Sequence, residues 1–182
     1  MPSTFQPTDL PAVILIEPRA FLDDRGFFLE SYKASEFAAA GIADPFVQDN
    51  HSYSNRGVVR GIHYQLPPHA QGKLVQVIAG AALDVAVDLR RSSPTFGAYV
   101  AYELSGENHR MLYIPPGFGH AFLALQDGTH FVYKCTAEYH KESEAGVRWD
   151  DEEIGISWPK MTILVSDKDQ VLPDLTEAEV FP

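Results

Sequence analysis

The chain of 182 residues contains a single cysteine, Cys135. One thiol excludes a disulfide within the chain and any metal site built from several cysteines, and it favours a reducing compartment, so we expect a cytoplasmic protein. The opening stretch, MPSTFQPTDL, lacks the basic and apolar regions of a secretory signal. The apolar run over residues 74–89 is interrupted by Gln76, Asp84 and Asp88, so we predict no membrane span and no membrane partner.

Basic residues are also scarce. The chain has 14 Lys and Arg against 25 Asp and Glu, which gives a net charge of −11. Binding to nucleic acid depends on neutralising phosphates, so this balance argues against a nucleic-acid partner. The same charge repels a small anionic ligand at long range, and a site for such a ligand must therefore be locally basic.

Short segments rich in β-branched and aromatic residues recur along the chain, separated by turn sequences such as DDRG, SNRG, SSPTFG and PPGFG. Strands at this spacing are typical of a β-sandwich or barrel. The predicted strands are residues 13–17, 27–32, 58–64, 74–79, 83–89, 98–104, 111–114, 121–125 and 130–136. One helix is predicted over KASEFAAAG, ending at Gly41, and a second near LPDLTEAEV. We expect one domain over residues 1–182, dominated by β-structure, with a few short helices.

The segment VVRGIHYQLPPHAQGKLVQV places Arg60, His63 and Lys73 among apolar residues. A buried arginine needs a partner. Two are plausible here: Asp84, or a ligand phosphate, whose geometry suits the guanidinium group. In a straight strand Arg60 and His63 point to opposite faces. They can share a pocket only if the strand bends, and Gly61 is the predicted hinge.

Each candidate residue also has an ordinary structural explanation. A histidine in a strand is more often a hydrogen-bonding group than a catalyst, a lysine at a strand end is typically solvated, and a strand tyrosine usually packs. The sequence DDRG fits an exposed hairpin turn, VQDNHSYS a polar loop, and LVSDKDQ an exposed charged turn.

The pattern of histidines bears on metal binding. Metal-binding cupins carry His-x-His followed by a glutamate, whereas this chain has His63 followed by Gln65. The second cupin-like stretch, IPPGFGHAF, supplies only His120. One histidine in each half does not complete a ligand set, so we expect a barrel without a metal ion.

Several motifs, in order over about residues 10–175, together resemble the dTDP-4-dehydrorhamnose 3,5-epimerase family: DDRGFFLE, QDNHSYSNRGVVRGIHYQ, QGKLVQV, DVAVDLRRSSPTFG, LYIPPGFGHAF, YKCTAEY and LVSDKD. The resemblance implies a cupin-like jelly-roll β-barrel in a homodimer that pairs through its N-terminal segments. It also implies an isomerase that inverts carbons 3 and 5 of a dTDP-4-keto-6-deoxyhexose through an enolate. The product would be dTDP-4-dehydro-L-rhamnose, and the reaction would need no cofactor.

The resemblance also assigns roles to individual residues. His63 matches the general base, Tyr133 the proton donor on the opposite face of the sugar, and Asp169 the carboxylate that orients the base. Lys73 matches a lysine near the keto oxygen. Positions that hold the dTDP-sugar are matched by Arg25, Glu30, Gln48, Asn50, Arg60, His120, Glu144 and Lys168, and positions that stack on the thymine by Phe28 and Tyr139.

Three alternatives stay open. A related enzyme that inverts a single carbon would use the same base and acid, and Gln76, where the family often has a basic residue, leaves room for altered specificity. A metal-dependent cupin would hold a stoichiometric ion. A sugar-binding barrel without activity would lack the set of His63, Tyr133 and Asp169, which is present here.

Overall fold

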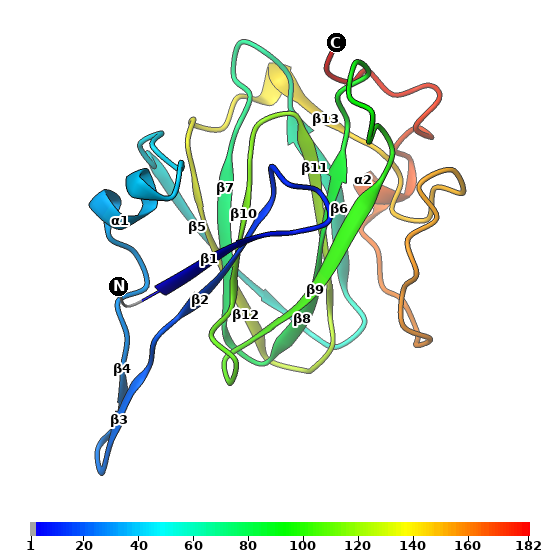
Figure 1. Ribbon diagram of the computed structural model, residues 1–182. Helices are drawn as coiled ribbons and strands as arrows, with labels where there is room; N and C mark the ends of the chain where they lie inside the picture. The colour runs from blue at the N-terminus through cyan, green and yellow to red at the C-terminus, as the bar shows by residue number, and fades with distance from the viewer. Residues whose placement is uncertain (1–2) are drawn as a thin grey trace.

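The computed structural model describes residues 3–182 and shows a cupin-like jelly-roll barrel (Figure 1). A six-stranded sheet runs in the order β1-β2-β10-β7-β12-β5, and a five-stranded sheet in the order β13-β6-β11-β8-β9. A separate hairpin, β3–β4, projects away from the barrel. The strands are β1 (Ser3–Pro7), β2 (Ile14–Pro18), β3 (Phe21–Asp23), β4 (Gly26–Phe28), β5 (Gln48–Ser54), β6 (Val59–Gln65), β7 (Lys73–Ala79), β8 (Ala81–Asp88), β9 (Tyr99–Ser105), β10 (Met111–Ile114), β11 (Phe118–Ala124), β12 (Thr129–Cys135) and β13 (Glu144–Gly146).

The two sheets pack through apolar side chains that both contribute. Val75, Leu112 and Phe131 of the six-stranded sheet belong to the same buried cluster as Leu104 and Phe122 of the five-stranded sheet. The rings of Phe122 and Phe131 stack with centroids 4.1 Å apart. This cluster fills part of the barrel interior and holds the strands that carry the polar residues described below.

Most of the predicted strands are confirmed. The predictions over 13–17, 58–64, 74–79, 83–89, 98–104, 111–114, 121–125 and 130–136 match β2 and β6 to β12 to within three residues. The prediction over 27–32 is only partly right, because the strand β4 ends at Phe28. Residues 48–54 were predicted as a polar loop and instead form β5.

The helices agree less well with the sequence. The early helix is confirmed as α1 (Ala34–Ala39), and Gly41, with φ at 90°, follows its end. The prediction of a second helix near residues 172–180 is wrong, because this segment consists of turns and irregular backbone in the structure. Leu175 and Ala178 are nevertheless buried there. The other short helices are η1 (Lys141–Ser143) and α2 (Asp167–Gln170). None of the helices over residues 3–182 has the length and apolar character to cross a membrane.

Candidate active site

A cavity of about 730 Å³ opens between the two sheets. Its volume lies in the range of pockets that hold small ligands. It brings together the predicted site residues His63, Tyr133, Asp169, Lys73, Gln48, Asn50, Arg60, His120, Glu144 and Lys168. Arg25 and Glu30 do not line it.

A bulge in β6 turns Arg60 and His63 toward this one cavity. Between two paired positions, β6 has one more residue than β11, and the chain bends at Gly61. Gly61 has φ at 121°, and a Cβ there would lie 2.5 Å from the carbonyl oxygen of His120. The predicted hinge is therefore confirmed, and only glycine fits it without strain.

His63 is paired with a carboxylate from a distant part of the chain. Its Nε2 lies 2.7 Å from Oδ1 of Asp169 on α2. The hydroxyl of Ser166 accepts the Asp169 N–H at 3.1 Å and so caps this short helix. The N–H of Val59 donates to the carbonyl of Leu164 at 2.9 Å, which ties the segment before α2 to β6. These contacts fix the carboxylate behind the imidazole.

The Asp169 carboxyl is almost fully buried, with 5% of its side chain exposed. Burial alone would raise its pKa, but the hydrogen bonds from His63 and from the N–H of Gly61 outweigh that effect and hold the pKa below its usual value. An ionised carboxylate at this position fixes the tautomer of the His63 ring and stabilises positive charge that develops on it.

Tyr133 reaches the cavity from the opposite sheet. It lies on β12 in the six-stranded sheet, whereas His63 lies on β6 in the five-stranded sheet. Burial raises the pKa of the Tyr133 phenol. An imidazole and a phenol therefore line one cavity from its two facing walls.

Lys73 is buried rather than solvated, with 9% of the residue exposed. Its Nζ donates to the carbonyl oxygen of His63 at 3.3 Å. Burial lowers the pKa of this amine, although nearby Cys135, Asp84 and Glu144 act in the opposite direction. The cavity thus holds a desolvated amine beside the backbone of His63.

Arg60 has no carboxylate partner among residues 3–182. Its guanidinium donates to the hydroxyl of Ser54 at 3.3 Å and to the carbonyl of Tyr53 at 3.2 Å. Of the two candidate partners, Asp84 is excluded, because it binds a histidine instead. The exposed guanidinium can still form charge-assisted hydrogen bonds with an anion in the cavity.

Asp84 does not line the cavity itself but binds a residue that does. Its Oδ1 lies 2.7 Å from Nε2 of His120, and both residues are buried. Burial lowers the pKa of His120, although the charge of Asp84 and its hydrogen bond act to raise it. The signal in the sequence is an acidic residue within the apolar strand LDVAVD, where an unpaired charge would cost on the order of several kcal/mol.

A linked group of side chains forms part of the rim. Lys168 Nζ lies 2.6 Å from Oε1 of Glu144, and the Tyr139 hydroxyl donates to Oε2 of Glu144 at 3.0 Å. The Tyr139 N–H donates to Oε1 of Gln48 at 2.8 Å. Burial would raise the pKa of Glu144, but the hydrogen bonds from Lys168 and Tyr139 hold it below its usual value. Hydrogen bonds from its backbone N–H and from its hydroxyl therefore hold Tyr139, with its exposed ring, beside the cavity.

Arg25 and Glu30 do not line the cavity: Arg25 belongs to the hairpin β3–β4, which projects away from the barrel (Figure 1), and Glu30 follows β4 by two residues. Arg25 occupies the turn between β3 and β4 and forms an ion pair with Asp23. Phe28, the last residue of β4, is 65% exposed. Within a single copy, the structure does not bring these three predicted binding residues to the site.

Comparison with known proteins reveals close similarity over nearly the whole chain. A family model described as dTDP-4-dehydrorhamnose 3,5-epimerase matches residues 7–177. The protein of that name from Shigella flexneri is 50% identical over 175 residues, which cover 96% of this chain and 97% of the relative. The crystal structure of a dTDP-4-dehydrorhamnose 3,5-epimerase from Sulfolobus tokodaii is 46% identical, with a TM-score of 0.93 and 100% of both chains covered.

Two further structures contain sugar nucleotides. A dTDP-6-deoxy-D-glucose-3,5-epimerase from Legionella pneumophila, in complex with dTDP-4-keto-L-rhamnose, is 45% identical, with a TM-score of 0.93 and coverage of 96% of this chain and 94% of that one. A 3'-monoepimerase from Streptomyces bikiniensis, in complex with dTDP-quinovose, is 37% identical, with a TM-score of 0.89 and coverage of 93% and 87%. The same fold therefore serves enzymes that differ in the number of carbons they invert.

Proposed function

Because the chain belongs to the dTDP-4-dehydrorhamnose 3,5-epimerase family, we propose that it inverts carbons 3 and 5 of a dTDP-4-keto-6-deoxyhexose. The product is dTDP-4-dehydro-L-rhamnose, and the enzyme is an isomerase. One observation carries the proposal: the pair of His63 and Asp169 faces the same cavity as Tyr133, from the opposite sheet.

The reaction begins with removal of a proton. Hydrogens on the two carbons beside the ketone are acidic, because their loss gives an enolate in which the charge rests on oxygen. His63 takes the proton, since an imidazole exchanges protons near neutral pH and Asp169 stabilises the charged ring. The 2.7 Å contact fixes the ring, so that one nitrogen is held by the carboxylate and the other faces the sugar.

The reaction ends with a proton from the other side. Tyr133 donates to the carbon, and the change of face inverts that centre. The raised pKa of this phenol keeps it protonated until an enolate, a much stronger base than water, is present. Lys73 holds the enolate oxygen, a contribution worth about 3 kcal/mol in comparable sites.

Substrate binding needs local positive charge in a chain of net charge −11. The guanidinium of Arg60 supplies it for the diphosphate. Gln48, Asn50, His120, Glu144 and Lys168 contribute polar contacts to the nucleotide sugar from the walls and rim. The exposed ring of Tyr139 offers a surface on which the thymine can stack. With one buried cysteine, the chain is suited to a reducing compartment, and we place the enzyme in the cytoplasm.

Arg25, Glu30 and Phe28 act in the cavity of a second copy. The hairpin that carries or precedes them exposes large apolar side chains, with Phe21 45%, Leu22 81%, Phe27 57% and Phe28 65% exposed. Such a cluster on a projecting hairpin is typical of a surface that packs against another chain. A homodimer with exchanged hairpins would cover these side chains and deliver a second guanidinium to the diphosphate.

Turnover in heavy water tests the proposal. The protein is incubated with dTDP-4-keto-6-deoxyglucose in D₂O, and the product is read by NMR. We expect deuterium at carbons 3 and 5, because a different, solvent-exchanged proton returns at each centre. His63→Ala should give no label while it still binds dTDP and keeps its circular dichroism spectrum. A wild-type product without deuterium at either carbon would contradict an enolate mechanism.

A single-site epimerase is the second candidate, favoured by the similarity to the 3'-monoepimerase. The same base and acid serve both reactions, so the number of labelled carbons separates them. Deuterium at one carbon only, with the second centre retaining its hydrogen over many turnovers, would establish the single-site enzyme.

A further inference from the structure

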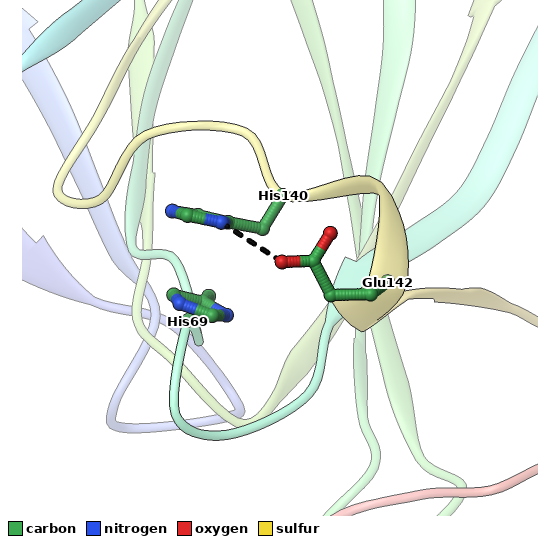
Figure 2. Close-up of side chains that lie close together, drawn as sticks. All are labelled: His69, His140 and Glu142. Atoms are coloured by element: carbon green, nitrogen blue, oxygen red, sulfur yellow. Dashed lines mark hydrogen bonds and ion pairs between the residues drawn. The ribbon is translucent and has the colours of Figure 1, made fainter.

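Two histidines and a glutamate lie close together (Figure 2), and none of them lines the cavity. His69 follows β6, His140 follows β12, and Glu142 lies on η1. One nitrogen of each ring and one carboxylate oxygen lie within 4.8 Å of one another. The mechanism proposed above uses none of these side chains.

The backbone that carries the two histidines is fixed by one buried side chain. The Gln65 amide donates to the carbonyl oxygens of His69 at 2.7 Å and Glu138 at 3.1 Å. Its Oε1 accepts the N–H of His140 at 2.6 Å. Three hydrogen bonds with Gln65 therefore hold the backbones of the two loops together.

The rings themselves are stacked, with centroids 3.5 Å apart and planes inclined by 11°. His69 Nδ1 lies 2.8 Å from the Ser143 hydroxyl, and His140 Nδ1 lies 3.2 Å from Oε1 of Glu142. In neither ring does Nε2 have a hydrogen-bond partner among residues 3–182. Each ring thus keeps a nitrogen that can bind a further group.

We propose that His69, His140 and Glu142 form a site for a divalent transition-metal ion such as Zn²⁺. Imidazole and carboxylate are ligands that zinc prefers, and three protein ligands leave one position for water. Magnesium and calcium favour oxygen ligands and should bind poorly. The site lies outside the cavity and therefore does not bear on the expectation of a barrel without metal.

Binding requires a small, local rearrangement. Ligand atoms around a tetrahedral zinc ion lie about 3.3 Å apart, so the farthest pair must close by no more than about 1.5 Å. Two parallel rings cannot both direct a lone pair at one ion, and one imidazole must turn out of the stack. The side chain of Glu142 is 71% exposed and the side chain of His140 is 38% exposed, so both have room to move.

An ion at this site would restrain the rim of the cavity. Tyr139 directly precedes His140, and Gln71 follows His69 by two residues; both line the cavity. The metal would join the two loops that carry them, in addition to the hydrogen bonds from Gln65. The bound ion would therefore cross-link two loops at the rim of the cavity.

Calorimetric titration tests the site on the full chain. After removal of metal with EDTA, wild-type protein is titrated with ZnCl₂ and, separately, MgCl₂ at pH 8. We expect one equivalent of Zn²⁺ per chain and no measurable heat from Mg²⁺. His69→Asn and His140→Asn should each weaken zinc binding at least about tenfold and abolish the zinc-induced rise in Tm, with an unchanged Tm in EDTA.

Two control variants locate the ion. His51 and His130 form another histidine pair, at 2.9 Å between ring nitrogens, and the double variant His51→Asn/His130→Asn should bind zinc as the wild type does. His63→Ala should also bind one equivalent. Anomalous scattering from a zinc-soaked crystal should show a peak between His69, His140 and Glu142. Three results would each overturn the proposal. They are no binding at about 0.1 mM Zn²⁺, full zinc binding by the His69 and His140 variants, and an anomalous peak at a different place.

Discussion

At the scale of single residues, two buried carboxylates of the barrel are each paired with a histidine. Asp169 accepts hydrogen bonds from His63, and Asp84 binds His120 at 2.7 Å. Burial of a carboxylate without such a partner would cost on the order of several kcal/mol in desolvation. The two pairs differ in exposure, because 32% of the His63 side chain is exposed against 7% of His120. The more accessible ring is the one suited to exchange protons with a substrate.

Replacement of Asp169 by asparagine leaves the base His63 in place and removes the carboxylate that orients it. The amide keeps the size of the side chain but cannot stabilise a charged imidazole, and it can bind the wrong tautomer. We expect kcat to fall by about 10²–10⁴ and KM to change little. Steady-state kinetics and the rate of deuterium uptake measure the effect. A Ser157→Ala control, at a position away from the cavity, should leave both unchanged. A normal kcat in Asp169→Asn would remove the carboxylate from the mechanism.

Most residues that line the cavity and the pairing of His63 with Asp169 were predicted from sequence, but the pairing of Asp84 with His120 was not. The family motifs pointed to His63, Tyr133, Lys73 and Asp169, which line one cavity. Of the two candidate partners for Arg60, Asp84 is excluded because it binds His120, and which of the two basic side chains reaches Asp84 depends on the bulge in β6 and on which side chains share a strand face. Such registers arise from pairing between distant strands, and a local pattern does not contain them.

At the scale of elements, the end of β8 is held by a buried carboxylate. Asp88 accepts hydrogen bonds from Arg90 Nη2 at 2.7 Å, from the Ser93 hydroxyl at 2.6 Å and from the Thr95 hydroxyl at 2.7 Å. Burial alone would raise the pKa of Asp88, but these donors lower it to about 2. One side chain therefore organises the connection that leads from β8 to β9.

This pKa predicts how stability depends on pH. The folded-state value lies below the ordinary value of 3.8, so the contribution is present above about pH 4 and is lost as pH falls through about 2. Asp88→Asn should reduce the free energy of unfolding by about 2 kcal/mol at pH 7, and by about half as much at pH 3. Urea denaturation at the two pH values measures the difference.

The chain offers a matched control for this carboxylate. Asp150 binds Arg148 at 2.7 Å with a similar spacing in sequence, but 39% of its side chain is exposed. Asp150→Asn should cost less than about 1 kcal/mol at either pH, because solvent screens an exposed pair. Equal losses from the two substitutions would show that burial of Asp88 is not what gives it its effect.

Strands rich in β-branched and aromatic residues could be predicted from the sequence. The strand β5 and the segment near residues 172–180 could not. The sequence of β5 predicts a loop because its inward-facing residues, Gln48, Asn50 and Ser52, are polar and line the cavity rather than an apolar core. The segment near residues 172–180 has helix-forming residues, yet its backbone follows the barrel surface and buries Leu175 and Ala178 from turns. In both places tertiary contacts outweigh local preference.

At the scale of the whole molecule, the hairpin β3–β4 is the feature that a single copy does not explain. It extends away from the barrel (Figure 1) and exposes apolar rings that the fold of one chain leaves uncovered. Arg25 lies at its turn, far along the hairpin from the two sheets that enclose the cavity. If a dimer exchanges these hairpins, each cavity is completed by two chains, and residues on different chains can be separated genetically.

Complementation between two impaired variants tests this exchange. Arg25→Ala lacks a binding group that we assign to the neighbouring cavity, and His63→Ala lacks the base of its own. In a hybrid dimer, one cavity combines His63 of the first chain with Arg25 of the second and is intact. Co-expression in equal amounts should therefore restore about a quarter of wild-type sites, because half of the dimers are hybrid and half of their cavities are complete.

The control pairs two residues of the same cavity. Co-expressed Tyr133→Phe and His63→Ala should give no recovery, since both side chains line one cavity of one chain and no hybrid site contains both. The measurement is the specific activity of purified mixed dimers, compared with the sum of the two variants assayed separately. Light scattering on the same samples reports the mass in solution. Activity no greater than that sum for Arg25→Ala with His63→Ala, in a sample shown to be dimeric, would confine Arg25 to its own chain and separate the hairpin from the site.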